Sequence, residues 1–325
     1  MSIIKQPSEI QEKKNLVMMV YGSPGSGKTT LAMSSPSPVL IDTDGGVGRT
    51  HTAHRVPTVQ VTKWEDVQQA MDEIAALPTI KTVIVDTVGK LLDYMSEYIT
   101  RTQPKMRKGY DGSLSLQGYG VRKTMFREFV KRCLMSQKNV VFIAHAQEDK
   151  VDDSFVVRPI VGGSSMADIM MELDLLGFMT DLGGKRVVLW GNDGTSFAKS
   201  FYSKNTCFLP NVMDVPQVVD FSGNVIAENR FLTDVLEHYE ESQKKKEEIN
   251  AGYDALVASI RERVSAAETG EDLDKLFADF QRKDFGHLYD SKLIASKALR
   301  DRALAIGFRW SKLDGKFVKD GINKA

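Results

Sequence analysis

The chain has 325 residues, 42% hydrophobic and 26% charged, which is enough to bury one large core and a smaller second one. Lys and Arg number 43, as do Asp and Glu, so no overall positive charge marks a nucleic-acid-binding protein, and any DNA contact must come from local patches. Cys133 and Cys207 lie far apart without metal-ligand spacing, which argues against a disulfide framework or a zinc site. Without a signal peptide or an apolar run of about 20 residues, we expect a cytoplasmic protein.

The first half of the sequence predicts an α/β fold. From residue 16 to about residue 178, short β-branched apolar runs alternate with helical patterns, which is typical of a parallel sheet covered by helices. Helices are expected over residues 64–77 and 121–135, where apolar residues recur at helical spacing. The expected strands are residues 16–21, 39–42, 82–86, 140–144 and 173–179.

The second half predicts a hairpin, a charged connection and a small helical domain. The segments 185–190 and 195–202 flank a Gly-Asn-Asp-Gly turn and predict a hairpin at one edge of the sheet. The small domain is expected to contain a capping box at Thr269 and Asp272, a helix over 291–306 closed by Gly307, and a hairpin around Asp314-Gly315. The expected divisions are an N-terminal arm (1–15), the α/β domain (16–236), a charged linker or helix (237–251) and the small domain (252–325).

A glycine-rich segment between the first strand and a helical pattern matches the phosphate-loop pattern GxxxxGK[ST] at every fixed position. Glycines allow successive backbone N–H groups to turn toward phosphate oxygens, and the helix that follows favours an anion at its start. We expect Lys28 to reach the β- and γ-phosphates of ATP and Thr29 to bind Mg²⁺ through its hydroxyl. The predicted nucleotide-binding residues are Gly22, Ser23, Pro24, Gly25, Ser26, Gly27, Lys28, Thr29 and Thr30.

Carboxylates end two of the predicted strands. Asp86 follows an apolar strand, and such a position beside a phosphate loop suits a second group that holds Mg²⁺. Asp42 and Asp44 are separated by one residue and therefore share a face of an extended segment. Asp44 is the candidate that orients or deprotonates the attacking water, while the alternatives are that Asp42 caps the turn and Asp44 binds ribose or Mg²⁺ indirectly.

These segments together resemble RecA-like recombination ATPases, and more closely the short phage-encoded members that act as ATP-binding single-strand annealing proteins. The matching segments are residues 21–32, 40–46, 83–87, 118–120 and 141–145. The resemblance implies a RecA-like P-loop core with ATP and Mg²⁺, the host cytoplasm as location, and self-association into a ring or filament. It carries the catalytic acid of the family onto Asp44. It also carries the residue that senses the γ-phosphate onto His145, with Gln147 as the alternative.

The resemblance also places two DNA-binding loops. One corresponds to residues 148–165, which begin with acidic residues and contain the cations Lys150 and Arg158. The other lies within residues 98–110, where four cations occur between tyrosines without an acidic residue, and cations and aromatic rings suit phosphates and bases respectively. The four cations are Arg101, Lys105, Arg107 and Lys108.

The C-terminal segment from residue 290 has nine Lys and Arg against four Asp and Glu, with three interleaved aromatic residues. It suits single-stranded DNA, a single-strand-binding or replication partner, or simply the small core of the domain. The favoured function is an ATP-dependent recombination protein that binds single-stranded DNA and promotes annealing or strand pairing. The alternatives are a helicase-like or packaging motor and a regulatory module switched by ATP, with a small-molecule kinase ranked lower.

Overall fold

The computed structural model describes residues 15–109, 111–151, 154–162, 165–191, 199–200, 209–220, 222–283 and 289–320. The chain divides into two compact units, and the division falls at Glu241. This position lies inside the long helix α6 (Phe231–Ser265), so the charged stretch after residue 236 is helical. Within the described residues, no helix combines the length and apolar character needed to cross a membrane.

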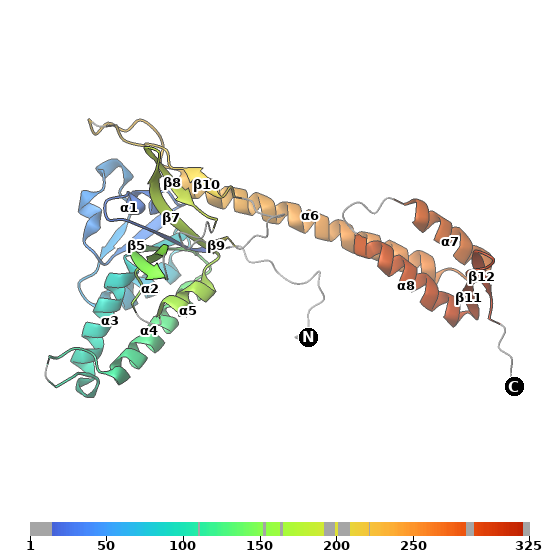
Figure 1. The fold of residues 1–325 in the computed structure, drawn as a ribbon, viewed down its shortest axis with the longest axis horizontal. Helices are drawn as coiled ribbons and strands as arrows, with labels where there is room; N and C mark the ends of the chain where they lie inside the picture. The colour runs from blue at the N-terminus through green and yellow to red at the C-terminus, as the bar shows by residue number, and fades with distance from the viewer. Residues whose placement is uncertain are drawn as a thin grey trace. The chain divides into compact units, whose positions relative to one another are not determined.

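The larger unit is built on one mixed sheet with the strand order β10-β8-β7-β1-β5-β4-β2-β3, and β6 and β9 pair with β5 and β7 respectively (Figure 1). The five pairings from β7 to β3 are parallel, whereas β7, β8 and β10 pair antiparallel at one edge. The predicted α/β fold with a mainly parallel sheet is therefore confirmed. The strands are β1 (Val17–Gly22), β2 (Pro38–Asp42), β3 (Thr58–Gln60), β4 (Thr82–Asp86), β5 (Asn139–Val151), β6 (Ser154–Pro159), β7 (Leu175–Leu182), β8 (Lys185–Leu189), β9 (Lys199–Ser200) and β10 (Val212–Asp214).

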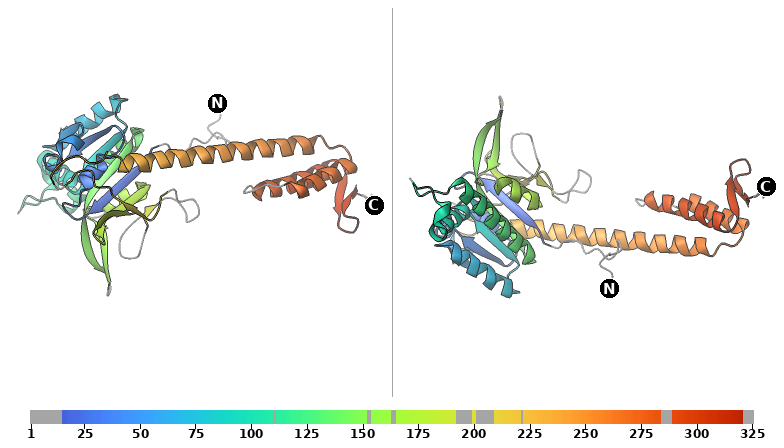
Figure 2. Two further views of the ribbon diagram at one scale, coloured as in Figure 1. Left: turned by 90° about the horizontal axis from the view of Figure 1, so that it is seen from above. Right: turned by 90° about the horizontal axis from the view of Figure 1, so that it is seen from below.

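Helices cover both faces of this sheet, which explains the continuous apolar runs of its strands. Alternate residues of β1 enter two different cores: Met19 and Tyr21 face one, and Met18 and Val20 face the other. The first core is completed by α2 (Trp64–Ala76), α3 (Val88–Thr102), α4 (Leu116–Met135) and α5 (Ser165–Glu172). The second is completed by α1 (Lys28–Ala32) and by the first turns of α6 (Figure 2). Each fully buried Leu, Met or Phe in these cores contributes roughly 1.5–3 kcal/mol.

The hairpin expected between residues 185 and 202 is wrong. β8 pairs with β7, and β9 pairs with β7 as well, instead of with β8. The turn between β7 and β8 contains Gly183 and Gly184, which have φ angles of 61° and 79°. A two-residue hairpin turn with positive φ at both positions matches the twist of the strands, and glycine adopts it without strain. The turn expected at residues 192–194 lies outside the described residues.

The segment 148–165, expected as a DNA-binding loop, consists largely of a two-stranded hairpin in its described part. β5 continues to Val151 and forms an antiparallel ladder with β6, in which Ala146 pairs with Pro159 and Val151 with Ser154. A cross-strand ion pair of 2.8 Å between Asp149 and Arg158 supports this hairpin. Asp149, one of the acidic residues at the start of the segment, therefore has its counter-charge on the neighbouring strand.

The smaller unit has its own core of helical and hairpin residues. α7 (Gly270–Arg282) begins with the predicted capping box, in which the Thr269 side chain and the Asp272 side chain bond each other's backbone N–H groups. α8 (Tyr289–Ala305) ends before Gly307, which has a φ of 79°, and β11 (Phe308–Ser311) pairs with β12 (Lys316–Lys319) around Gly315. The helices, capping box and hairpin predicted for this part of the sequence are confirmed.

Candidate functional site

The topology of the sheet brings the candidate residues to one edge. β1, β2, β4 and β5 are parallel, so their carboxyl ends meet on the same side of the sheet. In the register of these strands Gly22 lies beside His145, and Asp42 lies beside Asp86. β5, which contains His145, lies between β1, which leads into the phosphate loop, and β4, which ends at Asp86.

The phosphate loop requires glycine at three positions. Gly25 and Gly27 have φ angles of 76° and 98°, which side chains other than glycine rarely adopt. Gly22 has ordinary φ, but a Cβ there would lie 2.4 Å from the carbonyl oxygen of Met179 on β7. The loop is thus packed directly against the sheet, and α1 begins at Lys28 immediately after Gly27.

Lys28 is buried within the loop, with 6% of its surface exposed. Its Nζ donates hydrogen bonds to the carbonyl oxygens of Gly22 at 3.0 Å and Ser23 at 2.8 Å. Burial lowers the pKa of this ammonium group, and the nearby carboxylates of Asp86 and Asp44 oppose that effect. The amine is therefore held at the mouth of the loop by two acceptors that a phosphate oxygen can replace.

Thr29 and Asp86, the two residues expected to bind Mg²⁺, are hydrogen-bonded to each other. The Thr29 hydroxyl donates a 2.6 Å hydrogen bond to Oδ2 of Asp86, which is 5% exposed. Burial raises the pKa of Asp86 to about 6; the Thr29 hydrogen bond and Lys28 lower it, while Asp42 and Asp44 raise it further. These are oxygen ligands of the kind Mg²⁺ prefers. Within the described part of the chain, no three or more His, Cys, Asp or Glu side chains gather into a cluster that could hold a metal.

Asp42 and Asp44 have different surroundings. The carboxylate oxygens of Asp42 accept backbone N–H groups from Gly46 at 3.0 Å and Val47 at 3.1 Å, so this buried side chain caps the turn after β2. Asp44 is half-buried and close enough to Lys28 and His145 to raise the pKa of both. Asp44 is therefore the carboxylate of this strand end that faces the phosphate loop.

His145 and Gln147 also differ. His145 is half-buried, and its Nδ1 is buried without a hydrogen-bond partner among the described residues. Burial lowers the pKa of His145 most, Lys28 lowers it further, and Asp44 opposes both, so the neutral form of the imidazole is favoured. Gln147 is exposed, and its amide donates to the carboxylate of Asp149 instead. Of the two candidates, His145 is the one within electrostatic reach of Lys28.

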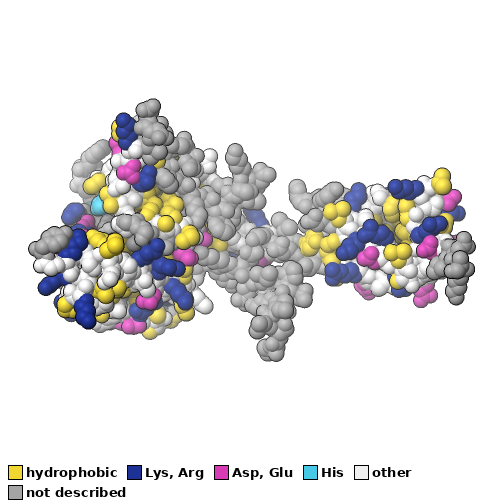
Figure 3. Space-filling model, turned by 60° about the horizontal axis from the view of Figure 1, so that its bottom comes forward, with side chains coloured by type: hydrophobic (Ala, Val, Ile, Leu, Met, Phe, Trp, Pro, Cys, Tyr) yellow, Lys and Arg dark blue, Asp and Glu magenta, His cyan; other side chains and the backbone are white. Residues whose placement is uncertain are grey.

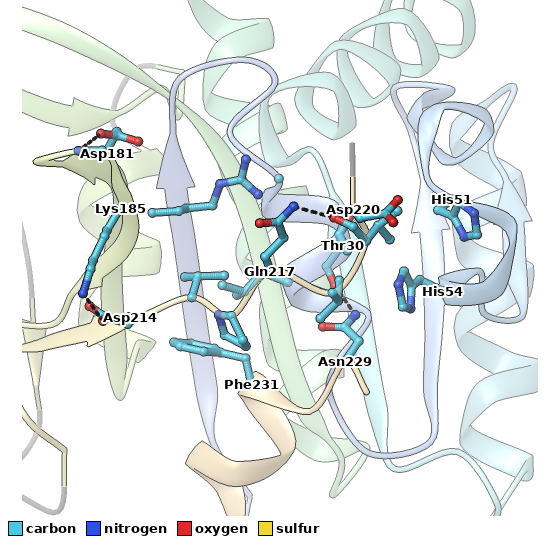
Figure 4. A pocket seen from close by; sticks show the side chains of 18 residues that line it. Thr30, His51, His54, Asp181, Lys185, Asp214, Gln217, Asp220, Asn229 and Phe231 are labelled. Carbon is cyan, nitrogen blue, oxygen red and sulfur yellow. Dashed lines mark hydrogen bonds and ion pairs between the residues drawn. The ribbon is translucent and has the colours of Figure 1, made fainter. Parts of the chain in front are cut away.

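A cavity of about 720 Å³ adjoins the phosphate loop (Figure 4). Gly27 and Thr30 line it on the loop side, and His51 and His54 line it from the segment after β2. The β7–β8 hairpin, including Arg186, forms another part of its wall. The rest comes from residues 214–220, from Phe231 and from Asn229, whose amide donates to the Thr30 carbonyl at 2.7 Å. The volume suits a ribose and a base. Sequence patterns missed this cavity because its lining residues come from five separate segments.

The candidate DNA-binding cations lie on two projections of the larger unit. Lys105 and Arg107 are exposed in the connection between α3 and α4, and Lys108 is half-buried there. Arg101 is part of α3 and forms a 2.5 Å ion pair with Glu65 on α2. On the β5–β6 hairpin, Lys150 is exposed and Arg158 is paired with Asp149 as described above. Tyr110, at the end of the expected basic segment, lies outside the described residues.

A phosphate loop, a strand-end carboxylate bonded to its threonine, and a strand inserted between the two define a P-loop ATPase. The chain belongs to the AAA domain family, whose model matches residues 14–202, more than half of the sequence. The matched segment contains all four strand ends of the site. A comparison with curated proteins found no match.

Proposed function

We propose that this protein binds and hydrolyses ATP with Mg²⁺, binds single-stranded DNA, and promotes annealing or strand pairing. The observation that carries the ATPase proposal is the 2.6 Å bond between Thr29 and the buried Asp86, directly beside Lys28. A glycine-rich turn without ATPase function has no need for a buried carboxyl at this position. The DNA proposal rests on the charge of the α3–α4 projection and on the resemblance to annealing proteins.

In the proposed reaction, Lys28 exchanges its bonds to the Gly22 and Ser23 carbonyls for bonds to the β- and γ-phosphates. Thr29 and Asp86 would hold Mg²⁺, which would neutralise charge on the phosphate oxygens. Asp44 accepts the proton of the attacking water at its carboxylate. His145, in its neutral form, donates or accepts a single hydrogen bond at the γ-phosphate and thereby distinguishes ATP from ADP.

The structure offers a direct connection from the site to the β5–β6 hairpin. β5 runs from Asn139 to Val151 without interruption, so His145 and the hairpin belong to the same strand. The hydroxyl of Tyr21, the residue before the phosphate loop, donates to the carbonyl of Val157 on β6 at 3.2 Å. A change at the γ-phosphate therefore reaches the hairpin through two contacts, which suits a protein whose DNA binding depends on ATP.

The DNA-binding proposal concerns the projection formed by residues 98–132, here called the α3–α4 projection. It has nine Lys and Arg against two Asp and Glu, a net charge of +7 in a chain whose overall charge is zero. Two of its arginines pair with acids on α2, Arg101 with Glu65 and Arg132 with Asp72. The exposed ring of Tyr119 lies 4.8 Å from the guanidinium of Arg122, which makes a surface for stacking bases. Figure 3 shows Lys and Arg side chains spread over this face of the larger unit.

The test is the ATPase rate with and without poly-dT, measured for three variants and the wild type. Asp44→Asn should lower kcat by about 10²-fold or more, with or without DNA, while ADP affinity stays within a few-fold. Replacing Lys105, Arg107 and Lys108 together by alanine should abolish stimulation by poly-dT and leave the DNA-free rate unchanged. The matched control replaces three exposed lysines elsewhere on this unit, Lys63, Lys81 and Lys90, and should keep the stimulation.

Two results would contradict the proposal. A full rate in Asp44→Asn would remove Asp44 from the reaction. An ATPase that poly-dT does not stimulate and that binds no poly-dT in the presence of ATP would sink the DNA function, leaving a nucleotide-switched module that binds a partner protein.

A further inference from the structure

We infer that Arg186 is a phosphate-binding residue that acts on the nucleotide held by its own chain. It lies on β8, an edge strand outside the phosphate-loop motif, and lines the cavity together with Gly27 and Thr30. A Cβ on Gly27 would lie only 3.0 Å from Nη1 of Arg186, so the guanidinium lies directly against the loop. The inference rests on the proposed ATP site and adds a ligand to it from a distant part of the chain.

The neighbours of Arg186 leave its guanidinium available. Asp181 lies opposite Arg186 in the β7–β8 ladder, but its carboxylate accepts the backbone N–H of Gly184 at 2.9 Å (Figure 4). Asp214 on β10 pairs with Lys185 at 3.6 Å. No residue of the described ranges forms an ion pair or side-chain hydrogen bond with Arg186. The guanidinium of Arg186 therefore lies beside the phosphate loop, and no carboxylate of the described residues pairs with it. A planar guanidinium in such a place can bind a phosphate through two parallel hydrogen bonds.

The position of Arg186 indicates which phosphates it binds. The wall it shares contains Gly27 and Thr30, whose backbone N–H groups belong to the part of the motif that cradles the α- and β-phosphates. The catalytic candidates Asp44, Asp86 and His145 are not part of this wall. Arg186 therefore approaches the α- and β-phosphates from the side of the ribose, away from the γ-phosphate. Such a contact is made equally to ADP and ATP, so it strengthens binding without changing the chemical step.

The geometry of the edge also explains why the arginine belongs to the same chain. The tight turn at Gly183 and Gly184 brings β8 back alongside β7, and β7 pairs directly with β1, which leads into the phosphate loop. The carbonyl of Arg186 accepts the N–H of Val215 at 2.8 Å, which ties β8 to the segment that forms the far wall of the cavity. Arg186 is thus fixed to the loop by sheet pairing within one chain.

The experiment measures the Kd of Mg-ADP and of Mg-ATP for Arg186→Ala, Arg186→Lys and Lys185→Ala. Arg186→Ala should weaken both nucleotides by the same factor, about 10-fold or more, because a charge-assisted bidentate contact is lost. Arg186→Lys should recover only part of this loss, since an ammonium group lacks the planar pair of donors. Lys185→Ala, which removes a neighbouring cation directed at Asp214, should stay within about twofold of the wild type.

Unchanged ADP affinity in Arg186→Ala would overturn the inference. A loss of affinity for ATP alone would also overturn it, because it would place the arginine at the γ-phosphate. The variant Lys28→Ala tests the ATP site separately from the Arg186 contact. Wild-type ADP binding by Lys28→Ala would overturn the proposed ATP site, whatever the result for Arg186. The assignment to the same chain is tested by mixing Lys28→Ala with Arg186→Ala at subsaturating ATP. ATPase activity that reappears on mixing would show that Arg186 serves a neighbouring subunit.

Discussion

Burial raises the pKa of Asp86, so the ionised carboxylate lowers the stability of the folded protein. Its pKa is raised from 3.8 to about 6, which corresponds to roughly 3 kcal/mol of preference for the protonated carboxyl in the folded protein. Because the folded-state pKa is above the unfolded one, the folded protein binds this proton more tightly, and the associated stability is lost as pH rises from about 4 through 6. At pH 8 the carboxylate is ionised and weakens the nucleotide-free fold, so the buried carboxyl of the candidate metal site lowers the stability of the protein.

We expect Asp86→Asn to stabilise the nucleotide-free protein more at pH 8 than at pH 4.5, by roughly 1–3 kcal/mol, because the amide carries no charge to desolvate. Urea denaturation at both pH values, without Mg²⁺, measures this difference. Asp93→Asn is the control, because Asp93 is exposed on α3 and pairs with Lys90 at the surface. Equal effects of Asp86→Asn at the two pH values would show that the carboxyl is already solvated in solution.

At the scale of elements, the two glycines of α4 have opposite environments. A Cβ on Gly118 would lie 2.7 Å from the Met106 carbonyl oxygen and 2.7 Å from a methyl of Leu114, whereas a Cβ on Gly120 meets nothing within 4 Å. Gly118 thus allows the α3–α4 connection to pack directly on the first turn of α4. Gly120 only lowers the helix propensity of an exposed position.

Gly120→Ala should therefore raise the free energy of unfolding by roughly 0.5–1 kcal/mol, and Gly118→Ala should lower it by about 1–3 kcal/mol. Gly118→Ala should also weaken poly-dT binding with ADP affinity unchanged, because it displaces the connection that contains Lys105 and Arg107. Thermal denaturation and fluorescence anisotropy of labelled poly-dT test the pair. Equal stabilities of the two variants would show that the connection does not pack on α4.

The elements that sequence patterns predicted well are those whose signal is local. The central residues of β1, β2 and β4 are apolar because helices cover both faces of the sheet. The capping box at Thr269 depends only on residues within one turn of the helix start. The β5–β6 hairpin was missed because Glu148, Asp149 and Lys150 are polar on both faces, so no alternation indicates a strand. Glycine-containing turns precede and follow β8, at Gly183-Gly184 and at residues 191–194, and the sequence alone favours neither as the hairpin turn. Only the pairing of β8 with β7 selects the turn at Gly183 and Gly184.

The same limit applies to the site. The phosphate loop and Asp86 could be predicted because each is part of a strand-to-loop motif, and parallel strands bring such ends together. Arg186 and Asn229 carry no motif, and each lies against the phosphate-loop segment although it is more than a hundred positions away in the sequence. Their contribution became visible only in three dimensions.

At the scale of the whole molecule, α6 belongs to two separate cores. Its first turns place Phe231, Leu232, Val235, Leu236 and Tyr239 in the core of the larger unit. Its last turns place Ile260 and Val264 in the core of the smaller unit. The charged stretch between them is exposed or half-buried wherever its side chains are described. The larger unit should therefore depend on the beginning of α6 and be independent of its end.

A chain that stops after Glu240 should consequently fold and bind ADP with wild-type affinity, whereas a chain that stops after Arg230 should not. The shorter chain uncovers the sheet face that contains Met18, Val20 and Leu40, and the loss of five buried side chains costs about 2–5 kcal/mol each, more than the stability of most domains. Circular dichroism and ADP titration of the two chains give the answer. If both chains fold alike, α6 contributes little to the larger core. If neither folds, the smaller unit is required for the fold of the larger, and the two cores are not energetically independent.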